Sequence, residues 1–306
     1  MSGHNDLAPG GRALAGERSS TRVSRNLFIA LFAGPLAFWQ GAFFVAPVVF
    51  MVVMTFWSVR NYLLTADLTL ANWQTILGAG YVWDAYLRSL LGAALAAAVA
   101  TVTALPCAYY LGLKASPRIR LLGACLIMAP FFTSFLVRTY TWRTMLGDQG
   151  VVNAVLGWFD IGPIQMINNL FGSVVGYLTL VMPLVLLLQL FSFAGVDRRL
   201  IEAGHNLGCT PRKTIFRVAI PAARNGIVLA AAFAFVLSFG DLISPQVLGG
   251  SNPPTLSILI VDQVRGGLQW PRASVIAVLM VLTLVMVVAG AMAFVYGGAP
   301  RRGKRG

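Results

Sequence analysis

The sequence predicts an all-α integral membrane protein with six transmembrane helices, and two observations support this fold class. First, 58% of the 306 residues are hydrophobic and only 11% are charged, with a mean hydropathy of +0.76. A soluble domain of this length could not cover its surface with so few charges, whereas lipid accepts an apolar surface. Second, the apolar residues gather in runs of about 20, the length that crosses about 30 Å of hydrocarbon.

The first predicted span is the charge-free stretch 27–57, which is far longer than the core of a signal peptide and is expected to bend at Pro35 and Pro47. Five further apolar stretches follow it: 90–113, 121–137, 171–193, 227–248 and 273–296. Helices rather than open strands are expected, because backbone polar groups in lipid need internal partners. The third span is the shortest, and Pro130 is its expected kink.

The predicted domain organisation is a disordered basic cytosolic tail over 1–26, a six-helix transmembrane domain over 27–296 and a basic cytosolic tail over 297–306. Most of the 23 basic residues fall in the two tails and in the loops around Lys114 and Arg212. The positive-inside rule therefore predicts that both termini are cytosolic.

The charge pattern and the polar residues exclude several function classes. The net charge of +13 lies in clusters between apolar runs, which favours membrane topology over nucleic-acid binding. The three cysteines and the two histidines show neither a disulfide framework nor metal-ligand spacing. No Ser/His/Asp constellation is present, so neither a catalytic nor a metal site is predicted.

The loop 197–221 between the fourth and fifth spans is predicted to form two short helices. Asp197 is a good N-cap for the first, and Gly208 is a good left-handed stop. Thr210 caps the second, Pro211 occupies its first position, and Pro221 is expected to end it.

One face of the first loop helix combines Leu200, Ala203, Gly204 and Leu207 at helical spacing, and a charged rim surrounds it. The small residues leave room for another backbone, which suits a shallow socket on a soluble partner. An amphipathic helix lying on the membrane surface is the alternative from the residues alone.

The same loop resembles the EAA loop of binding-protein-dependent ABC permeases, which reads Glu-Ala-Ala, three residues, Gly, nine residues and Ile-x-Leu-Pro. This chain has Glu202, Ala203 and Gly208, then nine residues before Val218-Ala219-Ile220-Pro221. It departs from the pattern at Gly204 in place of alanine and at Val218 and Ile220, which keep small or aliphatic character. The resemblance implies a type I ABC importer permease (MetI-like) bundle.

In that family the loop docks into a groove of the ATPase subunit. The implied coupling residues are Arg199, Glu202, Ala203, Gly204, Leu207, Gly208 and Pro221. The implied partners are an ABC ATPase dimer that binds ATP-Mg, a homologous second permease subunit, a periplasmic solute-binding protein and membrane lipid, with no nucleic acid. The chain itself would be no enzyme, would need no cofactor and would reside in the bacterial inner membrane.

Two stretches, 130–142 and 239–250, look like the spermidine/putrescine branch of the family, which implies a polyamine cargo. Opines, other amines, organosulfonates and amino-acid-like solutes remain alternatives. An ion-coupled secondary transporter is a rival from another class, but it would carry several intramembrane ionisable residues and this chain has one deeply placed acid, Asp241.

Asp241 is expected to face the bundle interior or a water-filled cavity, where it could attract a cation. A structural pair with Arg138 or Arg143, or a cap at a break before Pro245, is the alternative. The other candidate residues of the translocation path are Arg138, Trp142, Thr133, Ser134, Tyr109 and Gln189. For the last four, hydrogen bonding between helices is the alternative. Gly172 and Gly176 form a G-x-x-x-G pair that favours close helix packing.

Overall fold

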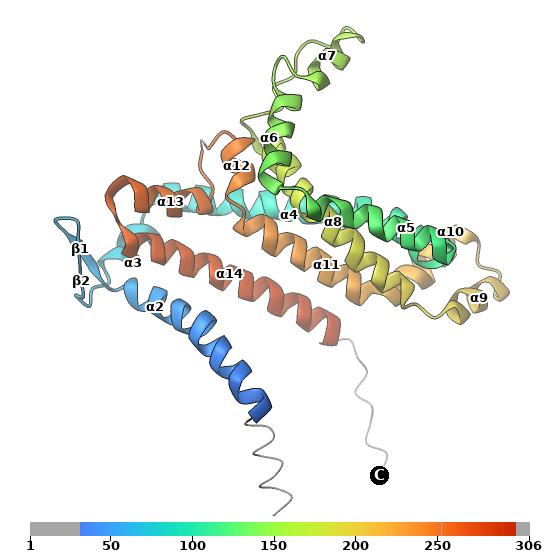
Figure 1. The fold of residues 1–306 in the computed structure, drawn as a ribbon, viewed down its shortest axis with the longest axis horizontal. Helices are drawn as coiled ribbons and strands as arrows, with labels where there is room; N and C mark the ends of the chain where they lie inside the picture. Colours follow the sequence, from blue (N-terminus) through green and yellow to red (C-terminus); the bar gives the residue numbers. More distant parts are fainter. Residues whose placement is uncertain (1–30, 252, 298–306) are drawn as a thin grey trace, which may run out of the picture. The chain divides into compact units, whose positions relative to one another are not determined.

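The computed structural model describes residues 31–251 and 253–297. The predicted tail over 1–26 and nearly all of the tail over 297–306 therefore lie outside the described residues. The chain divides into two units, Met1–Met54 and Thr55–Gly306. The described part is mainly helical, with one two-stranded hairpin in the second unit (Figure 1).

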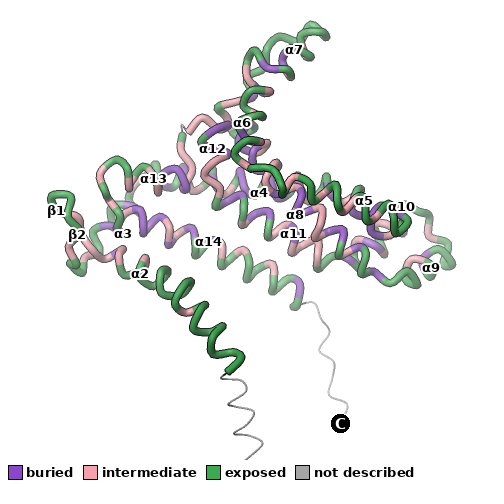
Figure 2. Tube along the Cα trace, in the orientation of Figure 1, coloured by how far each residue is buried: buried purple, intermediate pink, exposed green. Residues whose placement is uncertain are grey.

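The described part of the first unit is one helix, Leu31–Met54, which contains the π-helical turn η1 (Gly41–Val45) and then α2 (Ala46–Met54). The N–H of Ala46 bonds to the carbonyl of Gly41, five residues back, just before Pro47, which has no N–H to donate. This helix is apolar on all sides and buries no residue within the chain (Figure 2). Such a surface is typical of a helix that meets lipid or another subunit.

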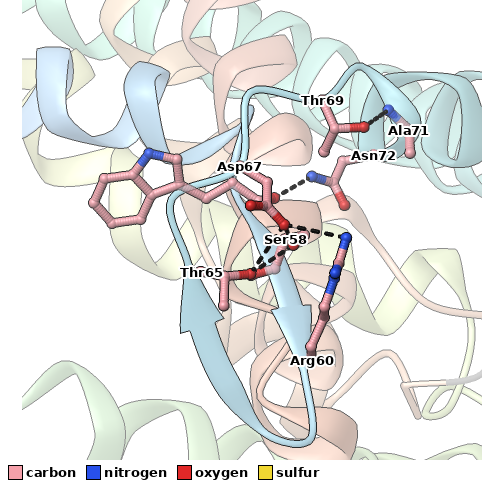
Figure 3. Close-up of polar contacts among 8 residues, drawn as sticks. Ser58, Arg60, Thr65, Asp67, Thr69, Ala71 and Asn72 are labelled. Carbon is pink, nitrogen blue, oxygen red and sulfur yellow. Dashed lines mark hydrogen bonds and ion pairs between the residues drawn. The ribbon is translucent and has the colours of Figure 1, made fainter.

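A β-hairpin that the sequence analysis did not predict opens the second unit. Strand β1 (Ser58–Arg60) pairs antiparallel with β2 (Leu63–Thr65) around a two-residue turn, Asn61-Tyr62, in which both residues have positive φ. Asp67 holds the hairpin together, since it accepts from Ser58 Oγ at 2.8 Å and pairs with Arg60 at 3.3 Å (Figure 3). Helix α3 (Ala71–Leu77) follows.

Four long helices form the body of the second unit and run beside one another (Figure 1). They are α4 (Gly80–Tyr109), extended by the π turn η2 (Tyr110–Lys114), then α8 (Leu170–Ala194), α11 (Ile220–Gly240) and α14 (Trp270–Gly297). Alanines of α4 and α11 fill the core, among them Ala93, Ala97, Ala230 and Ala234, and they meet valines of α8. Small side chains allow these helices to approach closely, as membrane helices do.

The predicted third span, 121–137, is not a straight helix. Helix α5 (Pro117–Met128) passes into the 3₁₀ turn η3 (Ala129–Phe132), and α6 (Phe135–Leu146) then starts at a bend of 89°. The kink expected at Pro130 is a complete break, because Thr133 and Ser134 both adopt extended backbone. The short helix α7 (Val151–Gly157) follows. The described residues therefore contain five helices long and apolar enough to cross a membrane, or six spans if the bent pair counts as one.

The prediction that Pro221 ends the second loop helix is wrong. Helix α10 (Pro211–Thr214), the π turn η4 (Ile215–Ala219) and α11 form one continuous helix, Pro211–Gly240, with Pro221 in the first turn of α11. The N–H of Ile220 bonds to the carbonyl of Ile215, five residues back. This wider turn lies just before the proline, which cannot donate to the usual α-helical ladder, and the chain continues.

The fifth span also ends earlier than the predicted boundary of 248. Helix α11 stops at Gly240, Asp241 is extended, and a separate short helix, α12 (Ile243–Val247), follows before α13 (Leu256–Gly267). Helix α12 packs on the G-x-x-x-G pair of α8. A Cβ added to Gly176 would lie 2.5 Å from Ser244 Cβ, and one added to Gly172 would lie 2.5 Å from the Leu248 carbonyl oxygen. The predicted close packing is confirmed, and its partner is α12.

Candidate coupling helix and transport path

Helix α9 (Arg198–Asn206) is closed at both ends by the residues that the sequence indicated. Asp197 Oδ1 accepts from the N–H of Arg199 at 2.9 Å. At the other end Gly208 has a φ of +79°. Its N–H bonds to the His205 carbonyl at 2.9 Å and that of Cys209 bonds to the Gly204 carbonyl at 3.0 Å. This pair of bonds is the Schellman motif, so α9 is a short helix with well-defined ends.

The inner side of α9 packs against the membrane-spanning helices. Ile201 lies against the cluster of Phe193, Ala219 and their neighbours. Gly204 is buried, and a Cβ added to it would meet Val218 Cγ2 at 3.3 Å. Gly204 therefore permits a close approach between α9 and η4, and it does not belong to an outward face as the sequence pattern had suggested.

The outer side of α9 exposes the remaining apolar residues of that pattern. Leu200 is 51% exposed, Leu207 is 84% exposed, and Ala203 lies between them and is also exposed. Arg199 and Glu202 are exposed as well. Two large, exposed aliphatic side chains on a short helix are typical of a contact surface for another protein. Their contact with an ATPase subunit stays a prediction.

Helices α9 and α10 lie together at one end of the four long helices, where α5 also begins, and the hairpin, α3 and α13 lie at the opposite end (Figure 1). The loops that the positive-inside rule assigned to one side of the membrane are thus at one end of the second unit. Pro221 is exposed at the same end, in the first turn of α11.

Asp241 is half-buried at the break between α11 and α12, where it accepts three hydrogen bonds. Its Oδ1 accepts from the N–H of Ile243 at 2.9 Å, and its Oδ2 accepts from the N–H of Ser244 at 3.2 Å and from Ser244 Oγ. Within the described ranges neither Arg138 nor Arg143 forms an ion pair with it. The geometry is that of a cap at the break, and contact with a transported cation stays a prediction.

Arg138 and Trp142 are brought together beside a groove of about 620 Å³ between α6 and α8. Arg138 Nη1 donates to the carbonyl of Thr179 at 3.1 Å. Pro183 lies four residues after Thr179 inside α8 and has no N–H, so the helix itself leaves that carbonyl without its usual donor. Arg138 thus donates to the carbonyl that Pro183 leaves without a donor from its own helix. The sequence analysis missed Pro183, whose place inside an apolar span was the available signal.

The other predicted path residues lie elsewhere. Thr133 Oγ1 donates to the Pro130 carbonyl at 2.9 Å within the α5–α6 break, and Ser134 is exposed beside it. Gln189 is fully buried and donates to the Thr101 carbonyl at 3.0 Å, which joins α8 to α4. Tyr109 lies at the α9 end of α4, against Phe193. The structure therefore does not gather the predicted path residues into one site.

Relatives and solved structures agree with this fold. No protein-family profile matches the chain. The chain is 25% identical to the spermidine/putrescine transport system permease protein PotB of Haemophilus influenzae over 228 residues, which are 72% of this chain and 77% of PotB. It is 27% identical to PotB of Escherichia coli K12 over 235 residues, 76% of this chain and 83% of that one. The Escherichia coli inner membrane ABC transporter permease YdcU is 25% identical over 281 residues, 86% and 88% of the two chains.

The fold is that of a solved bacterial ABC transporter for the import of alginate. A chain of that transporter superposes with a TM-score of 0.73 and 14% identity, over 92% of this chain and 100% of its own length. A second structure of an alginate transporter, in complex with a periplasmic protein that carries an alginate pentasaccharide, superposes with a TM-score of 0.71. The predicted resemblance to ABC importer permeases is confirmed, and the chain is a multi-pass membrane protein.

Proposed function

We propose that this chain, a transmembrane permease subunit of an ABC importer, lines the solute path in the bacterial inner membrane and transmits the movement of a separate ATPase through α9. The observation that carries the proposal is the two-sided structure of α9. Its inner side is fixed by Ile201 and Gly204, and its outer side offers Leu200 and Leu207 to a partner.

The connection from α9 to the membrane supports its role as a lever. The inner side of α9 packs on η4, and η4 belongs to the continuous helix Pro211–Gly240. A displacement of α9 would therefore move this span as a rigid body. The span ends at Gly240, and Asp241 lies in the break before α12 begins at Ile243. A hinge at such a break can absorb the change in direction between two arrangements of the bundle.

ATP binding would close two ATPase subunits and draw the coupling helices together, which would shift the bundle between inward and outward openings. Such a shift requires different contacts in the two states, and a docked helix supplies them. Hydrolysis of ATP-Mg belongs to the partner, and this chain needs no cofactor for its part. A homologous second permease subunit and a periplasmic solute-binding protein complete the assembly, with the α9 end and both termini in the cytosol.

The assembly is tested by purification of the chain from its native membrane in mild detergent. We expect an ATPase subunit to co-purify, because the exposed leucines of α9 would otherwise face water. Identification of that subunit by mass spectrometry and by ATP hydrolysis in the purified fraction measures the result. A chain that transports solute in liposomes without any such subunit would refute the proposed assembly.

A polyamine such as spermidine or putrescine is the favoured cargo, because relatives at 25–28% identity are spermidine/putrescine permeases. Asp241 is the acid in this chain best placed to attract a cation within the bundle. Opines, other amines, organosulfonates and amino-acid-like solutes remain the alternative cargoes.

Asp241→Asn tests the cargo and the role of the acid together. If the carboxylate attracts the cation, the variant should raise the KM for spermidine uptake by about five- to tenfold, the effect of one lost charge pair of about 1 kcal/mol or slightly more. Uptake by the reconstituted importer, with Ser244→Ala as the control that removes one partner of the cap, measures this change. An unchanged KM with a lowered thermal midpoint in both variants would show that Asp241 caps the break before α12 and does not attract the cation.

A further inference from the structure

Two neighbouring cavities at the α9 end of the second unit share one wall residue, Tyr109. One cavity, of about 270 Å³, lies between α9 and the end of α4 with η2. The other, of about 380 Å³, lies between α4 and the helix formed by η4 and α11. The first contains charged side chains and is called the charged cavity below. The second is lined by apolar side chains and is called the apolar cavity.

The charged cavity is lined by the charged side chains Lys114, Arg198 and Glu202, by His205, and by Tyr109, Leu113, Ile201 and Pro211. Lys114, at the end of η2, holds its ammonium 5.7 Å from the ring centroid of Tyr109. From α9 come Arg198, Glu202 and His205, at i, i+4 and i+7, so they form one stripe of that helix. Lys114 and Arg198 outweigh Glu202, and the cavity favours an anion.

The apolar cavity is lined by Val102, Leu105 and Pro106 of α4, by Phe193, and by Ile215, Phe216 and Ile220. Val102 is 64% exposed and Phe216 is 70% exposed, so the cavity is a groove that opens on the surface. Its α4 wall belongs to the candidate span Gly80–Lys114. A groove of this composition on a membrane helix suits a hydrocarbon chain.

We propose that the two cavities form a binding site for one anionic phospholipid from the leaflet at the α9 end. The phosphate group lies in the charged cavity between Lys114 and Arg198, and one acyl chain passes Tyr109 into the apolar groove. Charge complementarity selects the headgroup, and the adjoining apolar groove distinguishes a lipid from a free anion. The bound lipid would link α9 to α4 and hold the helix at a fixed height above the bilayer.

Binding of the headgroup in the charged cavity is tested with the intact importer in nanodiscs that contain equal amounts of phosphatidylglycerol and phosphatidylcholine. Native mass spectrometry of the extracted complex should show retained phosphatidylglycerol. Lys114→Gln should lower the retained amount about fivefold, the effect of one lysine at an anionic membrane surface. The matched control is Arg118→Gln, an exposed basic residue that lines neither cavity and should change nothing.

Binding of the acyl chain is tested independently by a substitution that fills the apolar groove with a larger side chain. Val102→Trp should remove the lipid, whereas Val99→Trp, on the same helix but outside the groove, should retain it. Size-exclusion profiles and ATPase content of both variants report on folding and assembly. Equal lipid retention in Lys114→Gln and wild type, or in Val102→Trp and wild type, would overturn the proposal.

Two further results would also overturn the proposal and identify another occupant. Complete displacement of the lipid by inorganic phosphate would identify a site for a free anion. Loss of the second permease subunit from Val102→Trp alone would identify the groove as a subunit interface.

Discussion

At Gly208 the backbone takes a left-handed conformation, with a φ of +79°, and a Cβ added there would meet no atom within 4 Å. The glycine is therefore required for its conformation and not for space. A non-glycine residue in this region costs about 1–2 kcal/mol, and a β-branched one more, although asparagine tolerates it. The end of α9 depends on this single residue.

Gly208→Val should lower uptake by the reconstituted importer while the ATPase subunits continue to hydrolyse ATP, because a distorted end of α9 would misplace Leu207. Gly208→Asn is the matched control and should keep most of the uptake. The ratio of solute transported to ATP hydrolysed, measured in proteoliposomes, reports the effect. Normal coupling in Gly208→Val would count against the role of α9.

Local signals explain why the ends of α9 could be predicted and its faces could not. Asp197 and Gly208 act on backbone atoms within four residues, and their roles follow from residue type. The inward position of Gly204 depends on Val218, which reaches it only through the turn into η4. Helical spacing alone placed Gly204 with Leu200 and Leu207, and long-range packing separated them.

At the scale of the elements, apolar length predicted the spans but not the extent of the breaks within them. The fourth and sixth spans agree with α8 and α14 within a few residues. A kink at Pro130 was expected, and a break before Pro245 was one alternative for Asp241. The 89° bend and the end of α11 at Gly240 were not predicted, because the residues around both breaks are themselves largely apolar. The hairpin turn Asn61-Tyr62 lacks the glycine that commonly marks a two-residue turn.

The contact between α8 and α12 is close enough to be tested by a single methyl group. Gly176→Ala places a Cβ 2.5 Å from that of Ser244 and should lower stability by about 1–3 kcal/mol. Gly290→Ala in α14 is the matched control, since a Cβ there would meet no atom within 4 Å. Thermal unfolding in detergent should show a lower midpoint for the first variant only, and equal midpoints would contradict the packing of α12 on α8.

At the scale of the whole molecule, the distribution of charge and of apolar residues predicted the class of protein, and the loop 197–221 predicted the resemblance to ABC permeases. The fold and the relatives confirm both. The translocation path was less predictable, since Asp241, Arg138, Gln189 and Tyr109 lie in different parts of the helical body. One chain's sequence does not specify which polar residues of distant helices meet, because that depends on how the helices pack.

Docking of α9 on the ATPase is tested most directly by a photo-crosslinking amino acid placed at Leu207, on the exposed side of α9, in the importer assembled with its cognate ATPase. The matched position is Leu122 on α5, which is also aliphatic and 70% exposed. We predict that position 207 captures the ATPase subunit, identified by mass spectrometry, and that position 122 does not. An absence of ATPase adducts at position 207 in a transport-competent complex would contradict the docking of α9 on the ATPase.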